Sequence, residues 1–187
     1  MPKPQGLYTA ALALLRAASP KPEHFRRALL LSEVMRRFAI LLGQEEKEEA
    51  YAAAGLLRHV QNTDAALISP AALKKAGADE LLLQAVAATA PVVDEDSFAT
   101  LLVTLDHLVT LILAVAATRP RQSVKGLKVS AVQKKFLDPH FARRSSRRQI
   151  QGGVRALHWE IGDFTSKTLK AILAAEDEVR TAVEKIA

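Results

Sequence analysis

Hydrophobic residues recur every three to four positions along most of this chain, and strict alternation of apolar and polar residues is almost absent. This periodicity is typical of amphipathic helices, so the sequence predicts an all-α protein with no sheet of three or more strands. Prolines and glycines separate the apolar segments and mark where helices begin and end. The expected helices cover residues 7–18, 22–43, 45–59, 70–77, 79–88, about 94–118, 130–137, 146–159 and 164–187.

Individual residues indicate where some of these helices begin and which of their faces are buried. Ser69 is a preferred N-cap residue before Pro70, and an aspartate at 94 or 96 is expected to cap the long apolar helix. Trp159 and Phe164 are expected to anchor the last helix rather than to stack on a base. The apolar stripe of the second helix is expected to consist of Phe25, Leu29, Val34, Phe38 and Leu41, and that of the last helix of Phe164, Leu169, Ile172, Leu173, Val179, Val183 and Ile186.

Neither an internal repeat nor a low-complexity linker divides the chain. We therefore expect one domain over residues 1–187, with a core at about 22–118 and a basic C-terminal helical subregion at about 119–187. A hydrophobic fraction of 49% excludes wholesale disorder. The absence of cysteine excludes disulfides, thiolate metal clusters and a cysteine nucleophile.

Two apolar segments raise the question of membrane targeting. The segment Leu101–Ala117 contains Asp106 and His107, which a bilayer core disfavours, so we expect a buried helix and no membrane span. Arg16 interrupts the apolar segment near the N-terminus, so we expect no signal peptide. The expected location is the cytoplasm.

Positive charge is concentrated in one part of the sequence. The net charge is +6, and residues 119–155 hold 11 Lys and Arg residues but one acid, whereas the remainder holds 15 basic and 19 acidic residues. This density is typical either of a solvated face or of a surface that binds phosphates, nucleic acid or acidic proteins. The candidate anion-binding or nucleic-acid-binding residues are Lys134, Lys135, Arg143, Arg144, Arg147 and Arg148.

Several short strings resemble the HD superfamily of metal-dependent phosphohydrolases, most closely its small bacterial members of unassigned substrate. Their order and spacing carry the resemblance, which covers roughly residues 22–172. The strings are RALLLSEVM at 27–35, AGLLRH at 54–59, TLDHL at 104–108, RP at 119–120, KVSAVQKKF at 128–136 and FA at 141–142.

The resemblance implies a metal held by a His, a His-Asp pair and an Asp on a long helix, where the cation binds phosphate and activates water. In this sequence, Arg27 stands at the first position, Arg58 and His59 replace the pair, and Asp106 alone matches. A guanidinium has no lone pair to donate to a metal. We therefore expect a degenerate active site without metal, cofactor or catalytic residue, in which Arg27 or Arg58 pairs with Asp106.

Three functions remain open at this point. The first is a pseudoenzyme, an inactive HD-like domain that acts as a binding or regulatory protein. The second is a protein that binds nucleic acid non-specifically through residues 119–155. The third is a phosphohydrolase with residual activity. Expected partners are nucleic acid or another phosphate-bearing ligand at the basic surface, or a protein, and no membrane.

Overall fold

The structure is a computed structural model that describes residues 6–18, 20–90 and 97–185. Every regular element within these ranges is helical, which confirms the all-α prediction. The elements are α1 (Leu7–Ala17), α2 (Pro22–Leu41), η1 (Glu45–Lys47), α3 (Glu48–Asp64), η2 (Ala65–Leu67), α4 (Pro70–Lys75), α5 (Glu80–Ala87), α6 (Ser97–Ala117), α7 (Val129–Phe136), α8 (Arg147–Ala156) and α9 (Ile161–Glu184), where η denotes a 3₁₀ helix.

Among the described residues, Ser69, Gly43 and Gly77 lie at helix ends, as the sequence predicts. The Ser69 hydroxyl accepts a hydrogen bond from the backbone N–H of Ala72 and so caps α4. Gly43 and Gly77 follow α2 and α4 with φ angles of 67° and 107°. This left-handed conformation ends a helix without the steric cost that a side chain would add.

Several helix boundaries differ from the expected ones; for example, α9 begins at Ile161 rather than at residue 164. Helix α3 continues to Asp64 instead of ending at His59, since neither proline nor glycine follows His59 before that point. Helix α8 ends at Ala156, and His158 then adopts a positive φ of 56°, which turns the chain toward α9. The caps expected at 94 and 96 lie outside the described residues.

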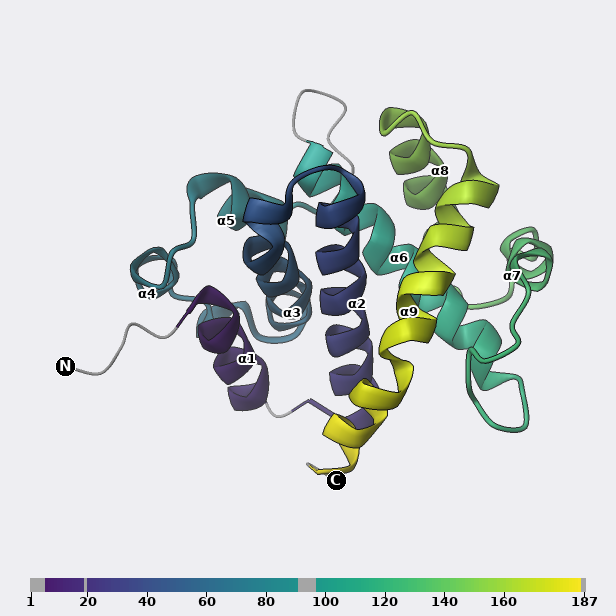
Figure 1. Cartoon of the computed structure of the whole chain (residues 1–187), viewed down its shortest axis with the longest axis horizontal. Helices are drawn as coiled ribbons and strands as arrows, with labels where there is room; N and C mark the ends of the chain where they lie inside the picture. The colour runs from purple at the N-terminus through teal and green to yellow at the C-terminus, as the bar shows by residue number, and fades with distance from the viewer. Residues whose placement is uncertain (1–5, 19, 91–96, 186–187) are drawn as a thin grey trace.

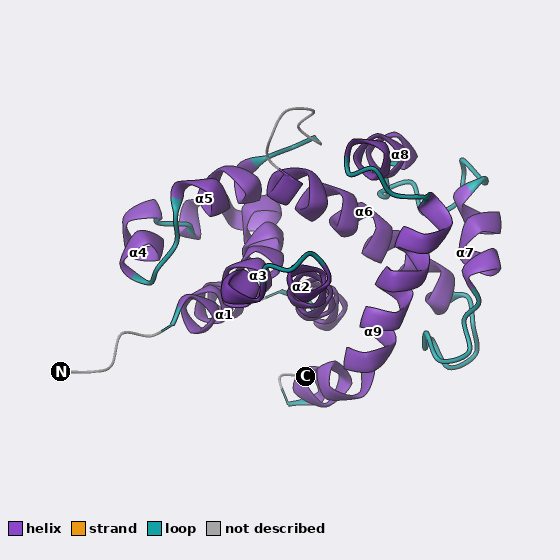
Figure 2. Ribbon diagram, turned by 45° about the horizontal axis from the view of Figure 1, so that its top comes forward, coloured by secondary structure: helices purple, strands orange, loops and turns teal. Residues whose placement is uncertain are grey.

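Helix α2 lies at the centre of the molecule and packs against α3 on one side and α9 on the other (Figure 1). Helix α1 covers α3, while α5 and α6 pack across the same bundle. Helices α7 and α8 lie against α6 at the end away from α1 and α4, as a second view shows (Figure 2). The basic segment of the sequence therefore forms one end of the molecule.

Most described members of the apolar stripes predicted for α2 and α9 are buried, but each stripe contains one error. The first four members of the α2 stripe are buried, as expected, whereas the side chain of Leu41 is 47% exposed. On α9, Leu173 is 42% exposed, and the predicted stripe member Ile186 lies outside the described residues. Leu41 and Leu173 lie on parts of their helices that no neighbouring element covers, so helical spacing alone placed them in the core wrongly.

Three aromatic rings fix the start of α9 against α2. The ring centroids of Phe38 and Phe164 lie 5.1 Å apart, and the ring of Trp159 lies 6.2 Å from Phe38 and 5.8 Å from Phe164. Offset or edge-on contacts at these separations are favourable. The structure confirms the anchoring role predicted for Trp159 and Phe164.

Two glycines allow close contact between helices. A Cβ atom added at Gly55 on α3 would lie 2.6 Å from the backbone N and Cα of Ser32 on α2. A Cβ atom at Gly153 on α8 would lie 1.7 Å from the Thr104 hydroxyl oxygen on α6. Gly153 therefore allows close packing of α8 against α6.

Helix α6 is long and apolar enough to span a membrane by length and composition. The segment Phe98–Ala117 has a mean hydropathy of 2.1, and 72% of the residues in its most apolar window are buried inside the protein. Such burial is also the property of a core helix in a globular domain. Among the described residues, α6 contacts six other helices, namely α2, α3, α5, α7, α8 and α9.

Candidate functional site

Three helices bring Arg27, Arg58 and Asp106 together at the place where the family resemblance implies a metal. Arg27 on α2 donates from Nη2 to Oδ1 of Asp106 on α6. Arg58 on α3 donates from Nε to Oδ2 of the same carboxylate, at 3.2 Å. Both arginines considered as partners of Asp106 thus bind it, one on each oxygen, and we call this group the Arg–Asp–Arg triad.

The triad is buried at its centre and opens toward solvent at one edge. The side chains of Asp106 and Arg58 are 5% and 6% exposed, whereas that of Arg27 is 24% exposed. Arg58 also donates from Nη1 to the backbone carbonyl oxygens of Val86, at 3.1 Å, and Ala88. These carbonyls lie at the C-terminal end of α5, where the helix dipole favours a cation.

The two arginines hold Asp106 in its charged form. Burial by itself raises the pKa of a carboxyl group, because the charged form loses hydration. The positive charges of Arg27 and Arg58 outweigh that effect, so the pKa of Asp106 is lower than its ordinary value. At neutral pH the carboxylate is ionised, and two guanidinium groups surround one negative charge.

His59 lies beside the triad and is neutral at neutral pH. Its ring centroid is 5.4 Å from that of His24 on α2. Burial, the positive charge of Arg27 and the nearby His24 lower the pKa of His59 to about 4, although Asp106 acts in the opposite direction. A neutral imidazole is able to bind a metal, but the adjacent guanidinium of Arg27 opposes a cation there.

The lowered pKa of His59 predicts a loss of stability in mild acid. The unfolded chain binds a proton near pH 6.5 and the folded chain near pH 4, so stability is fully present above pH 6.5 and declines as the pH falls toward 4. The decline amounts to about 3 kcal/mol at most, at about 1.4 kcal/mol per pKa unit. Urea unfolding followed between pH 7 and pH 4 measures it.

Replacing this histidine tests the assignment. His59→Gln should flatten the decline, while His140→Gln, at an exposed position, should leave it unchanged. The pKa of the partly buried His107 is also lowered by burial, so a smaller decline should persist in His59→Gln. An unaltered pH profile in His59→Gln would contradict the prediction.

The side chains at this position do not fit a metal. Within residues 6–18, 20–90 and 97–185, no group of three or more His, Cys, Asp or Glu side chains is arranged to hold a metal ion. Both oxygens of Asp106 accept hydrogen bonds from guanidinium groups, which compete with any cation for them. The triad is therefore a network of ion pairs with a net positive charge. We derive no metal-dependent reaction step from it.

The candidate basic residues have different environments. Arg147 donates to six backbone carbonyl groups at the end of α7 and in the loop that follows it, those of Lys135, Phe136, Asp138, Phe141, Ala142 and Ser145. Its guanidinium is thus engaged in holding that loop. By contrast, Arg143, Arg144 and Arg148 are exposed, and Arg143 contacts the His140 ring at 3.4 Å.

Basic residues line a hollow on each side of α7. The α7–α8 hollow has a volume of about 630 Å³, and Arg143, Arg147 and Arg148 contribute to its wall. A second hollow, between α7 and the end of α6, has a volume of about 620 Å³ and is lined by Arg119, Lys128, Lys134 and Lys135 among others. The structure therefore brings five of the six candidate residues to one end of the molecule, and Arg144 lines neither hollow.

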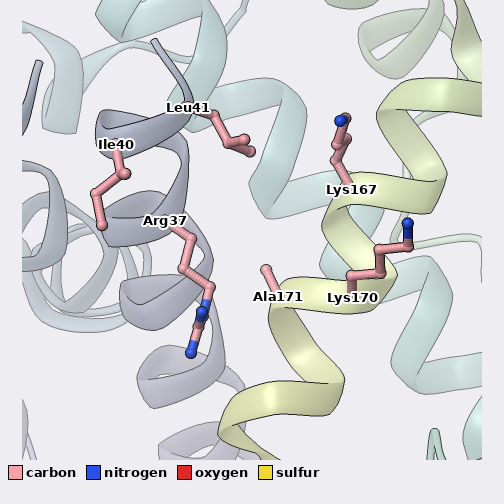
Figure 3. Close-up of a pocket in the computed structure, with 6 residues that line it drawn as sticks. All are labelled: Arg37, Ile40, Leu41, Lys167, Lys170 and Ala171. Atoms are coloured by element: carbon pink, nitrogen blue, oxygen red, sulfur yellow. The ribbon is translucent and has the colours of Figure 1, made fainter. Parts of the chain in front are cut away.

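A further hollow, which sequence reasoning missed, lies between α2 and α9 (Figure 3). We call it the α2–α9 groove. Leu41 points from α2 toward α9, and Ala171 points from α9 toward α2 (Figure 3). The groove has a volume of about 330 Å³, and its lining residues are Arg37, Ile40, Leu41, Lys167, Lys170 and Ala171. The available signal was the apolar run Ile40-Leu41-Leu42 at the end of α2, which extends beyond the one face of the helix that the predicted stripe covers.

No protein-family model, no curated protein and no solved structure matches this chain. The likeness to the HD superfamily therefore depends on the sequence strings alone.

Proposed function

We propose that this chain is a catalytically inactive, HD-like helical domain that acts as a binding or regulatory protein. The observation that supports the proposal most strongly is the Arg–Asp–Arg triad. In the expected metal position, a guanidinium group from each of two helices occupies one oxygen of the single remaining carboxylate. A cation there would face two fixed positive charges at short range.

The triad also supports a role in binding rather than in chemistry. It joins α2, α3 and α6, and through Arg58 it also holds the end of α5. The three helices on which the resemblance places the metal ligands are thus held together by charged side chains. The scaffold is then stable without an ion, and its surfaces remain available for partners.

Hydrolysis and metal binding together test the proposal. Wild-type protein should bind Mn²⁺, Mg²⁺ or Zn²⁺ no better than Asp106→Asn does in titration calorimetry, and should not hydrolyse p-nitrophenyl phosphate. The triple variant Arg27→His/Arg58→His/His59→Asp restores the ligand types that the resemblance implies, and should gain metal affinity. Metal-dependent hydrolysis by the wild type that disappears in Asp106→Asn would overturn the proposal in favour of a residual phosphohydrolase.

A second candidate function is non-specific binding of nucleic acid at the α7 end of the molecule. The two basic hollows on either side of α7 support it, because seven Lys and Arg residues line them, and such cations attract phosphates. Stacking aromatics are few: Phe136 and Phe141 are partly buried, and Lys135 covers the Phe141 ring at 4.8 Å. The binding would therefore depend on the phosphate charge of the nucleic acid rather than on its base sequence.

Salt dependence distinguishes this second function. If four phosphates are contacted, the affinity for a fluorescent single-stranded DNA should fall roughly 50-fold between 50 and 200 mM salt. Lys134→Ala/Lys135→Ala should weaken binding, whereas the matched pair Lys74→Ala/Lys75→Ala on α4 should not. Binding that is insensitive to salt, or equally weakened by both pairs, would exclude this function.

A further inference from the structure

The α2–α9 groove exposes apolar side chains that a folded chain normally covers. Ile40 and Leu41 are each 47% exposed, and the adjoining Leu42 is 36% exposed. Among the described residues, these three make up half of the six large hydrophobic side chains that are exposed. A contiguous apolar patch with a polar rim is a frequent property of protein interaction sites.

The rim of the groove is positively charged. Arg37 on α2 and Lys167 and Lys170 on α9 line it, and no acidic residue does. In Figure 3 the two lysines extend from α9 on the side of the groove opposite Arg37. A ligand that fills the groove would therefore meet apolar contacts at its floor and cations on both sides, which is complementary to a surface that combines apolar and acidic residues.

The shape of the groove favours a helix as its occupant. Both walls are helices, and each contributes residues one turn apart: Arg37 and Leu41 on α2, and Lys167 and Ala171 on α9. A third amphipathic helix is able to lay its apolar face between two such helices, with anchors at the same spacing. We propose that the α2–α9 groove docks an acidic amphipathic helix of a partner protein.

A second copy of this chain fits the groove less well. The chain has a net charge of +6, so its copies repel one another. The densest acidic run of the described residues lies at 45–49, and part of it is already engaged within the molecule. Glu48 pairs with Arg36 at 3.1 Å, and Glu49 accepts a hydrogen bond from the backbone N–H of Tyr8 at 3.0 Å.

Two synthetic peptides test the proposal with the full-length protein. Both are 16-residue amphipathic helices with the same leucine stripe, and their polar faces carry either glutamate or lysine. In fluorescence anisotropy, the glutamate peptide should bind at least tenfold more tightly than the lysine peptide. Equal binding of both peptides, or no binding of the glutamate peptide at 1 mM, would overturn the proposal.

Charge-matched variants separate the groove from the basic end of the molecule. Lys167→Glu/Lys170→Glu should reduce affinity for the glutamate peptide at least tenfold, while Lys134→Glu/Lys135→Glu on α7 should change it less than twofold. If the α7 double variant lost more affinity for the glutamate peptide than the α9 double variant did, the peptide would bind at the basic hollows, and the proposal would be refuted. The groove shares no residue with the triad, so this result is independent of whether the domain is inactive.

An apolar variant tests the floor of the groove. Ile40→Ser should weaken the glutamate peptide severalfold, whereas Leu81→Ser should not, although Leu81 on α5 is similarly exposed at 52%. Circular dichroism should show both variants folded. Two other results would refute a helical partner. The first is that the glutamate peptide does not bind, whereas anionic lipid vesicles bind and Ile40→Ser weakens that binding. The second is that the protein forms concentration-dependent dimers that Ile40→Ser abolishes.

Discussion

Asp106→Ala should destabilise the protein by about 3–5 kcal/mol, the effect typical of removing one partner from a buried ion pair. The substitution leaves Arg58 buried and charged, with only the carbonyl groups at the end of α5 to compensate it. Arg27 is partly exposed, so it is able to turn to solvent. Thermal unfolding should show a fall in Tm of roughly 10 °C or more for a chain of this size.

The double variant Asp106→Leu/Arg58→Met serves as the critical comparison. It removes both buried charges, so it should recover much of the loss, as apolar replacement of buried ion pairs often does. Recovery should be incomplete, since the carbonyl groups of Val86 and Ala88 lose their donor. Asp177→Ala is the exposed control, because Asp177 pairs with Lys125 and Arg180 at the surface and its loss should cost much less than the loss of Asp106. A loss no greater than this control would show that the triad is dispensable for stability.

Gly55→Ala should have the second largest effect, a destabilisation of about 3 kcal/mol or more. The added methyl group would lie 2.6 Å from two backbone atoms of Ser32, and backbone cannot move aside as a flexible side chain can. Overpacking of this kind typically costs about 1–3 kcal/mol, and the upper end applies where backbone is the obstacle. Chemical denaturation of the purified variant measures the change.

Gly152→Ala provides a control with the opposite sign. Gly152 also lies within a helix, but no atom is within 4 Å of a Cβ added there. Alanine is the better helix former, so this variant should be more stable by roughly 0.5–1 kcal/mol. If both alanine variants changed stability in the same direction, the effect of Gly55→Ala would be due to helix propensity rather than to the contact between α2 and α3.

The sequence predicts the helices from local periodicity, and it predicts the ion pair of Asp106 from the resemblance to the HD superfamily. Helical spacing located α2 and α9, and Arg27 and Arg58, at positions where the resemblance implies metal ligands, indicated that a guanidinium would meet Asp106. Spacing reports which face of a helix is apolar but not whether a neighbour covers it. For that reason it placed Leu41 in the core, although the structure leaves this residue exposed in the α2–α9 groove.

Long-range polar contacts could not be predicted in the same way. Glu176 lies beside Asp177 and Glu178 in the sequence, yet it is only 4% exposed. It accepts hydrogen bonds from Arg26, at 3.1 Å, and from Ser123 and the Val124 backbone N–H, at 2.8 and 3.0 Å. These donors lie at least 52 positions away along the chain, and only the tertiary fold shows that they converge.

The six carbonyl groups bound by Arg147 have a consequence for how mutations at the basic end should be interpreted. The guanidinium supplies the hydrogen-bond donors for a loop that has no regular structure of its own. Losing Arg147 would therefore abolish ligand affinity by deforming the wall of the α7–α8 hollow, even if Arg147 never touches a ligand. Neutralising Arg143 or Arg148 would instead weaken affinity with the wall intact. Equal losses of affinity at these positions would have different origins, and only the loss at Arg147 would be accompanied by a loss of order.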